Sequence, residues 1–193
     1  MFRKELEEYI RKISWVSDDI FEELYRLFRP FKLKKYDFFI KEGAYANQIG
    51  FLNKGVVRAF FLNDAGKEYN KQFFVGASII GAYTSLLTKQ PNQIAQQALT
   101  DCELLVADYQ QVEALYKKHH ELERFGRKIA EYYFLEKEQK EIEMALLDAE
   151  KRYRIFRKTF PQIELIIPQY HIASYLSISP TQLSRIRKKM TEI

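Results

Sequence analysis

The sequence predicts an α+β protein: an N-terminal antiparallel β-roll flanked by helices, then a long helix, then a helical C-terminal domain. Two patterns carry this prediction. From residue 31 to residue 107, short runs of aromatic and β-branched residues are separated by glycines, which is typical of short antiparallel strands joined by turns. Before and after this segment, apolar residues recur every three or four positions, which is the period of a helix.

Length and composition limit what the chain can be. Its 193 residues suffice for one large or two small domains, and 47% of them are hydrophobic, so a core can be buried. The single cysteine, Cys102, excludes an intramolecular disulfide, and we interpret it as a small buried residue rather than a redox sensor. Because there is no signal peptide and no apolar run near 18 residues, we expect a cytoplasmic protein.

Residues 2–28 are predicted to form helices. Leu6 and Ile10 belong to one apolar stripe, and Ser17 is followed by two aspartates, as at the capped start of a second helix. That stripe continues until Pro30, where the helical pattern ends. Nothing in this segment indicates chemistry.

Glycines mark the predicted turns of the central segment. Six of the chain's seven glycines lie there: Gly43, Gly50, Gly55, Gly66, Gly76 and Gly81. The sequence from Asn63 to Gly66 predicts a hairpin with Gly66 in the left-handed conformation. Each of these glycines is interpreted as a turn residue, so they indicate the fold rather than a ligand.

The segment 108–147 returns to the helical period. A short helix ends at His119 and His120, which we interpret as surface residues, because neighbouring histidines do not share a helix face and a metal site needs more ligands. A long helix then follows to about Leu147. Its apolar stripe needs a partner, which is either the chain's own roll or a second copy of the chain. The stripe includes Phe125, Ile129, Tyr132 and Tyr133.

Residues 148–167 are predicted to begin the C-terminal domain. A helix with five basic residues ends at Pro161, and the short apolar run from Ile163 to Ile167 either pairs as a strand or packs under the segment that follows. The basic residues are Lys151, Arg152, Arg154, Arg157 and Lys158.

Residues 168–190 contain two short helical patterns separated by a tight break at residues 177–179. Ser179 can cap the second helix, and Pro180 suits its first position. One stripe of this helix is apolar (Leu183, Ile186, Met190), and the opposite face is polar and cationic. A helix of this kind fits a DNA major groove. The alternative is a helical hairpin that only packs on the rest of the chain.

The charge distribution favours the DNA-binding interpretation. The whole chain carries +5, but residues 151–193 contain nine lysines and arginines and two acids, a net charge of +7. Residues 1–150 therefore carry −2. Since phosphate contacts supply most non-specific affinity for DNA, positive charge concentrated at the helical pair supports this function.

The run IASYLSISPTQLSRIRKK resembles the helix-turn-helix of the Crp/Fnr-type bacterial transcription regulators. The run from Lys41 to Gly81 is similar to the cyclic-nucleotide-binding β-roll of the same family, through Glu42-Gly43, Gly55, Asp64-Ala65-Gly66-Lys67 and Gly81. The resemblance implies a roll domain at residues 1–118, a dimerisation helix at 119–147 that includes Phe125, Ile129, Tyr132 and Tyr133, and a helix-turn-helix domain at 148–193. Many relatives continue into a β-hairpin wing, for which we expect no room after Met190.

The resemblance also assigns DNA contacts. It places Arg185 against a guanine, because arginine can bridge the two acceptors on that base edge. Thr181, Gln182 and Ser184 would meet neighbouring bases or phosphates, and Arg187, Lys188 and Lys189 would meet phosphates. Gln169 and Ser179 complete the predicted DNA-binding set. Relatives with charged residues in the first turn have Pro180-Thr181 here instead, so their operator sequence cannot be transferred.

The family's ligand segment departs from its pattern. Where relatives hold the ribose with a glutamate, this chain has Ala82, and the phosphate-binding arginine falls near Asn92 or Gln93. A buried cyclic phosphate without a cation would be poorly compensated, so we predict that cyclic AMP does not bind tightly. The degenerate pocket, which includes Gly81, Ala82, Tyr83, Thr84, Asn92 and Gln93, holds another ligand, is vestigial, or is filled by Tyr83.

The resulting hypothesis is a homodimeric, sequence-specific regulator that binds a palindromic operator in double-stranded DNA. Its other expected partners are a second copy of the chain and an unknown small-molecule effector. The alternative is a ligand-sensing module whose DNA binding is weak or lost. We expect no enzyme activity, cofactor, metal or membrane partner, because the sequence has no nucleophile–base set, no phosphate loop opening a helix and no metal cluster.

Overall fold

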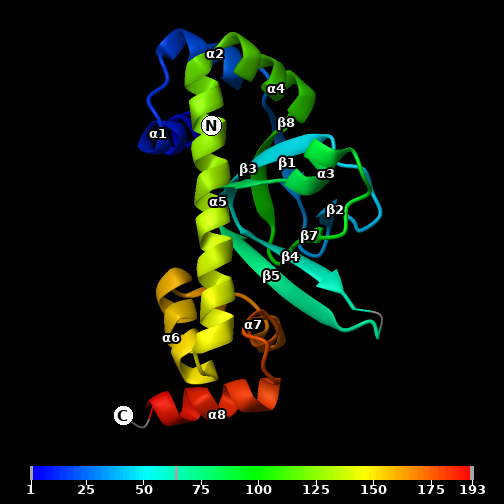
Figure 1. Cartoon of the computed structure of the whole chain (residues 1–193), viewed down its shortest axis with the longest axis vertical. Coiled ribbons are helices and arrows are strands. Elements are labelled where there is room, and N and C mark those ends of the chain that lie inside the picture. Colours follow the sequence, from blue (N-terminus) through cyan, green and yellow to red (C-terminus); the bar gives the residue numbers. More distant parts are fainter. Residues whose placement is uncertain (1, 64, 192–193) are drawn as a thin grey trace.

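The computed structural model describes residues 2–63 and 65–191. Asp64, which belongs to the predicted hairpin turn, and residues 192–193, at the end of the predicted C-terminal domain, lie outside the described residues. The predicted α+β class is confirmed. Figure 1 shows the long helix α5 along the molecule, with helices at one end, strands along one side and the C-terminal helices at the other end.

The N-terminal helices cover one face of the strands. The first is α1 (Arg3–Ile13) and the second is α2 (Asp18–Tyr25), whose N-cap is Ser17 with two aspartates in the first turn, as predicted. The Ser17 side chain, however, makes no capping hydrogen bond. Its backbone amide instead donates to the carboxylate of Glu121 at 2.8 Å, which fastens the start of α2 to α5.

In the part of the chain that the structure describes, eight strands form two antiparallel sheets. One has the order β1-β8-β3-β6 and the other the order β2-β7-β4-β5. The strands are β1 (Arg29–Leu33), β2 (Phe38–Ile40), β3 (Gln48–Lys54), β4 (Val56–Leu62), β5 (Glu68–Val75), β6 (Ser78–Ile80), β7 (Ala95–Ala98) and β8 (Cys102–Asp108). A short helix, α3 (Tyr83–Thr88), interrupts them before β7. The predicted roll is therefore present, with Cys102 buried in β8 as expected.

The glycines serve two purposes. Around the predicted hairpin, the Gly66 amide donates to the Asn63 carbonyl at 2.8 Å, and Gly66 has a φ of 73°, as predicted for a left-handed turn residue. Gly50 is a correction, because it lies inside β3 rather than at a turn. A Cβ there would come within 3.1 Å of Ile80 and 3.2 Å of Phe39, so a small residue is needed for packing.

Among the described residues, four further α-helices complete the C-terminal half after the short helix α4 (Tyr109–Lys118). They are α5 (His120–Leu146), α6 (Ala149–Thr159) and the helical pair α7 (Gln169–Tyr175) and α8 (Pro180–Thr191). The run after Pro161 forms a 3-10 turn, η1 (Ile163–Leu165), so the strand alternative is wrong. Ile163 and Ile167 are buried beneath the helical pair instead.

Apolar side chains gather in three clusters. One joins α1, α2, α4 and the first half of α5 to the sheet of β3 and β8. A second fills the inside of the roll. The third is the core of the C-terminal helices, and it also contains Val56, Phe73 and Leu99 from the roll. The C-terminal helices therefore share a core with the roll and do not hang from α5 alone.

Candidate functional site

The two C-terminal helices are joined by the tight turn that the sequence predicted. Ser177 has a φ of 55°, and the next amide, of Ile178, donates to the Ala173 carbonyl at 3.0 Å, which ends α7. Ser179 then accepts a hydrogen bond from the Gln182 amide at 3.1 Å, so its predicted capping role is confirmed. Leu183 is fully buried and fixes the inner face of α8.

The outer face of α8 is exposed at the end of the molecule farthest from α1 and α2 (Figure 1). The exposed predicted contacts are Ser179, Thr181, Gln182, Ser184, Arg185, Lys188 and Lys189. Arg187 and Gln169 are half-buried. The structure thus brings the predicted residues of α8 together on one accessible cationic face, the shape and charge that a DNA groove requires.

Several cations near this face already have partners within the chain. Lys189 pairs with Glu150 at 2.8 Å, and Arg187 lies 3.7 Å from Glu164. Arg152, one of the five basic residues of the predicted helix before Pro161, donates to the carbonyls of Met144 and Leu147 at 3.3 and 3.2 Å. It caps the end of α5, where positive charge is favourable, and so is not part of the DNA-facing set.

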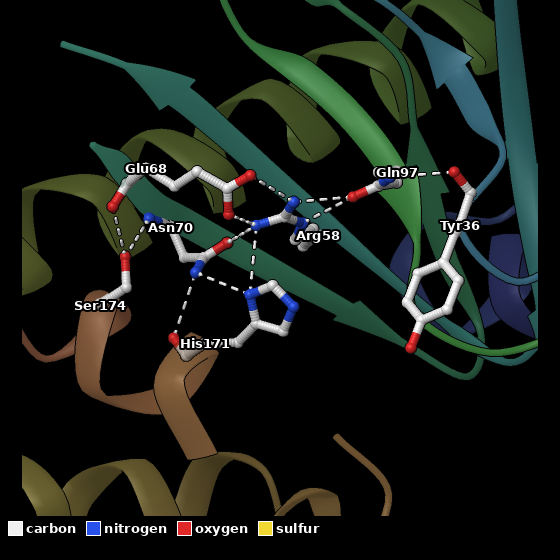
Figure 2. Close-up of polar contacts among 7 residues, drawn as sticks. All are labelled: Tyr36, Arg58, Glu68, Asn70, Gln97, His171 and Ser174. Atoms are coloured by element: carbon white, nitrogen blue, oxygen red, sulfur yellow. Dashed lines mark hydrogen bonds and ion pairs between the residues drawn. The ribbon is translucent and has the colours of Figure 1, made fainter. Parts of the chain in front are cut away.

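A polar network that the sequence analysis missed holds α7 against the roll (Figure 2). Its centre is Arg58 on β4, which is 4% exposed and forms an ion pair with Glu68 through both guanidinium ends. Arg58 also donates to Gln97 at 2.7 Å and to Asn70 at 3.3 Å. The one signal in the sequence was an arginine inside an otherwise apolar run, Val56 to Leu62.

Two residues of α7 join this network. The His171 ring accepts from the Arg58 guanidinium at 3.1 Å, and the Asn70 amide donates to the His171 carbonyl at 3.2 Å (Figure 2). The Ser174 hydroxyl donates to the backbone carbonyl of Glu68 at 2.9 Å and accepts from the backbone N–H of Asn70 at 3.0 Å. The first helix of the pair is therefore hydrogen-bonded directly to β5.

His171 acts here as a neutral acceptor. Burial, followed by the charge of Arg58, lowers its pKa to about 4, while Glu68 opposes the shift. Near neutral pH the ring is therefore uncharged, and its Nδ1 can accept a hydrogen bond from the Arg58 guanidinium. The same contact explains why His171 belongs to the fold rather than to a metal site. In the described part of the chain, no cluster of three potential metal ligands was found.

A lysine of α5 provides a second link between the roll and α7. Lys140 donates to the Lys71 carbonyl at 2.6 Å, and its ammonium lies 3.4 Å from the centre of the Tyr175 ring. Burial, and then the charge of Lys71, lowers the pKa of Lys140 from 10.5 to about 7, whereas Glu143 raises it. Lys140, which belongs to α5, thus contacts both β5 and α7 at the junction of the roll and the helical pair.

This lysine makes stability depend on pH. Between pH 7 and pH 10.5 the unfolded chain binds one more proton at this site, so the free energy of unfolding should rise with pH, by up to about 1.4 kcal/mol per pH unit. Lys140→Met, which cannot titrate, should lack this contribution. Urea unfolding of the wild type and the variant at pH 7 and pH 9 measures the free energy of unfolding at each pH. An equal change between the two pH values in both proteins would contradict the lowered pKa of Lys140.

The six predicted pocket residues, Gly81, Ala82, Tyr83, Thr84, Asn92 and Gln93, line one partly open cavity of about 1300 Å³. It lies between the roll, α3 and α5. Tyr83 is 46% exposed, and its ring packs edge-on against Tyr109 with the centroids 6.1 Å apart. The alternative that Tyr83 fills the pocket is therefore wrong.

The polar side chains at the predicted phosphate position bind the protein itself. Asn92 is 6% exposed, and its amide donates to the carbonyls of Lys41 and Ile94 at 3.2 and 2.7 Å. The buried Ser85 hydroxyl donates to Gln90 and accepts from Ala46. These groups shape the loop, and neither supplies a charge that would compensate a phosphate.

The four predicted interface residues of α5 do not lie alike. Phe125 is 8% exposed and belongs to the core with α1, α2 and α4, and Ile129 packs against that core. Tyr133 donates to the Ile79 carbonyl at 2.9 Å, so it faces the roll. Only Tyr132 is exposed. The exposed large apolar residues of α5 are Tyr132 and four that were not predicted, namely Phe134, Leu135, Ile142 and Leu146.

In the described part of the chain, none of the helices combines the length and apolar composition that crossing a membrane requires.

Comparison with known proteins agrees with this geometry. Residues 30–119 match the family model of the cyclic nucleotide-binding domain, whereas no curated protein matches the chain significantly by sequence. Among solved structures, FixK2 from Bradyrhizobium japonicum aligns with a TM-score of 0.77 at 15% identity, over 86% of this chain and 85% of that one.

Two further structures align over nearly the full chain. The c-di-GMP responsive global regulator CLP from Xanthomonas campestris aligns with a TM-score of 0.70 at 16% identity, covering 91% of this chain and 92% of its own. A putative regulator of the crp/fnr family from Eubacterium rectale aligns with a TM-score of 0.71 at 14% identity, covering 92% and 85%. Residues 30–119 are therefore similar to a cyclic nucleotide-binding domain, and the chain has the fold of a Crp/Fnr-type regulator.

Proposed function

We propose that the chain is a homodimeric, sequence-specific DNA-binding regulator in which α8 enters the major groove of each half-site. The observation that carries this proposal is the exposed cationic face of α8, capped by Ser179 and placed at the free end of the molecule. In this division of labour, residues 1–118 sense, residues 119–147 dimerise and residues 148–193 bind DNA. The regulator fold supports the same assignment.

The same proposal excludes control by cyclic AMP. Ala82 and Asn92 offer neither the carboxylate nor the cation of a nucleotide site, and the Asn92 amide is occupied by backbone carbonyls. An anionic phosphate placed there would lose its hydration without gaining an ion pair. DNA binding by this chain should therefore not depend on the nucleotide.

Selection of bound sequences from a random DNA pool, with and without cyclic AMP, tests both statements. A palindromic motif recovered without the nucleotide supports a dimeric regulator that has lost cyclic AMP control. A motif recovered only with cyclic AMP would contradict the exclusion of the nucleotide. No enrichment under either condition would favour the second candidate, a ligand-sensing module with weak DNA binding, which the intrachain ion pairs of Arg187 and Lys189 also favour.

Arg185→Ala is the sharpest test of the groove contact. An arginine that bridges one guanine contributes about 1–3 kcal/mol of discrimination at that base pair, so the variant should lose roughly ten- to hundredfold in specificity at one position of each half-site. Competition binding with operators mutated base by base measures the loss.

Lys188→Ala is the matched control for this test. A phosphate contact positions the protein without reading sequence, so this variant should weaken binding to all sequences equally and reduce its salt dependence. If Arg185→Ala keeps the wild-type ratio of specific to non-specific binding, the role assigned to Arg185 is wrong.

A further inference from the structure

Two lysines meet in the cavity at its border with the C-terminal helices. Lys71 comes from β5 and Lys140 from α5, and both line the cavity. The Lys140 ammonium donates to the Lys71 carbonyl at 2.6 Å and lies 3.4 Å from the centre of the Tyr175 ring. The chain therefore places positive charge on β5 and α5, and none at the loop of Ala82 and Asn92.

Neither lysine has a carboxylate partner among residues 2–63 and 65–191, where no ion pair involves either ammonium. The acids of α5 that lie nearby are engaged elsewhere. Glu141 pairs with Lys137 at 3.5 Å, Glu143 accepts from Gln139 at 3.0 Å, and Glu136 accepts from the Tyr132 hydroxyl at 2.7 Å. Two half-buried cations thus face the same cavity without an ion pair from the described chain, although Glu136 and Glu141 also line it and the charge of Glu141 raises the pKa of Lys71.

This arrangement is electrostatically unfavourable without a ligand. Burial, and next the charge of Lys137, lowers the pKa of Lys71, and burial with the charge of Lys71 lowers the pKa of Lys140 to about 7. A bound anion would favour the charged forms of both groups and so gain charge-assisted hydrogen bonds.

The walls of the cavity determine what accompanies this anion. They are largely apolar and aromatic, with Phe74, Ile79, Ile129, Tyr133 and Phe134 among the lining side chains. A volume of about 1300 Å³ exceeds what a small inorganic anion needs and suits a ligand with an extended apolar body. Burial of that body would supply the hydrophobic part of the affinity.

One buried polar atom on the same cavity has no partner among the described residues. Gln96 is 4% exposed and lines the cavity, and its Nε2 donates to the Gly81 carbonyl at 3.0 Å. Its Oε1 accepts no hydrogen bond. A buried acceptor of this kind costs stability unless a donor from a ligand or a water satisfies it, so it marks a second polar position on the cavity wall, where a donor and not the carboxylate would bind.

We propose that this cavity binds an amphipathic monoanion, an apolar body with one carboxylate, and that Lys71 and Lys140 hold the carboxylate. The site lies in the same cavity as the degenerate nucleotide pocket but uses different residues. A carboxylate that binds Lys140 also competes with the contact between Lys140 and Tyr175 on α7. This consequence for α7 rests on the proposed function, whereas ligand binding itself does not.

A fluorescent fatty acid tests the binding site directly. Cis-parinaric acid, whose emission rises in apolar surroundings, is titrated into the full-length protein alongside its methyl ester, which has the same body without the charge. The acid should bind at least about tenfold more tightly than the ester, as expected for a charge-assisted contact. Equal affinity of acid and ester, or no binding of the acid, would overturn the proposal.

Variants identify the cations. Lys71→Met and Lys140→Met should each weaken binding of the acid about tenfold or more and leave the ester within about twofold. Lys71→Arg keeps the charge and should retain most of the affinity, which separates loss of charge from misfolding. The matched control is Lys117→Met, at the exposed end of α4 and outside the cavity, which should bind like the wild type. Wild-type binding of the acid by Lys71→Met would also overturn the proposal.

Two further arms distinguish the possible sources of failure. Cyclic AMP and inorganic phosphate should not displace the probe, and displacement by either would show that a phosphate site, not a carboxylate site, is present. DNA binding is measured separately on the same protein by gel shift. Probe binding without DNA binding would support the carboxylate site and reject the proposed function. DNA binding without probe binding would reject the carboxylate site and support the proposed function.

Discussion

Replacing Arg58 by alanine should lower the free energy of unfolding by about 3 kcal/mol or more. The side chain is 5% exposed, and its guanidinium satisfies Glu68, Asn70, Gln97 and His171 at once. Removal takes a donor from four acceptors, of which those of Asn70 and His171 belong to buried residues. It also opens a space beside the Phe60 ring, whose centre lies 3.7 Å from the guanidinium carbon. Urea unfolding near neutral pH measures the loss.

The control is an exposed arginine with a single partner. Arg127 pairs only with Glu131 across one helical turn, among the pairs that the structure describes, and both side chains are more than half exposed. Arg127→Ala should change the free energy of unfolding by less than about 0.5 kcal/mol. A similar loss in both variants would mean that the Arg58 network contributes no more than a surface ion pair.

The same network should limit the movement of the DNA-binding helices. His171 and Ser174 both lie on α7, so loss of Arg58 should increase amide hydrogen exchange in α7 more than in α1. Equal increases in the two helices would indicate a global loss of stability only. Because α7 directly precedes α8, the contact also determines where the proposed recognition helix lies relative to the roll.

The second large effect concerns dimerisation. Leu135, Ile142 and Leu146 are 62%, 52% and 76% exposed on α5 and are spaced by seven and four residues, which puts them on one seam. We propose that this seam, with Tyr132, packs against its copy in a homodimer. Leu135→Glu combined with Ile142→Glu should raise the dimer dissociation constant at least about hundredfold, because each buried aliphatic side chain contributes about 1.5–3 kcal/mol.

Sedimentation equilibrium over a range of protein concentrations measures this constant. The control is Leu165→Glu, the same change at a leucine that is 84% exposed on η1, away from α5. It should leave the dimer unchanged. A wild-type protein that stays monomeric at high concentration, or a double variant that dimerises normally, would contradict the proposed seam.

The order of helices and strands could be predicted from local sequence because short-range chemistry determines it. Ser179 and Pro180 start α8 by capping and by a missing amide, and Gly66 permits a left-handed turn. Patterning also identified the exposed cationic face of α8. These features depend on residues within a few positions of one another, so no tertiary contact was needed to predict them.

Local sequence did not decide which apolar face packs where. Phe125, Ile129 and Leu135 all fit a helical stripe, yet the first two pack within the chain and the third is exposed. Gly50 looks like any turn glycine until Phe39 and Ile80 are seen to pack beside it. Periodicity specifies a face but not its partner, because the partner comes from a distant part of the chain.

The sequence by itself determined the roll, the long helix and the capped helical pair, and it predicted that the phosphate-binding charges are missing. Only the tertiary structure brought Arg58 to His171, 113 residues away, and Lys140 to Lys71, 69 residues away. Buried polar groups must find partners wherever the fold places them, and those partners are separated along the chain by whole elements. The docking of α7 and the two cations in the cavity therefore emerged only after the sheets, α5 and the C-terminal helices were packed together.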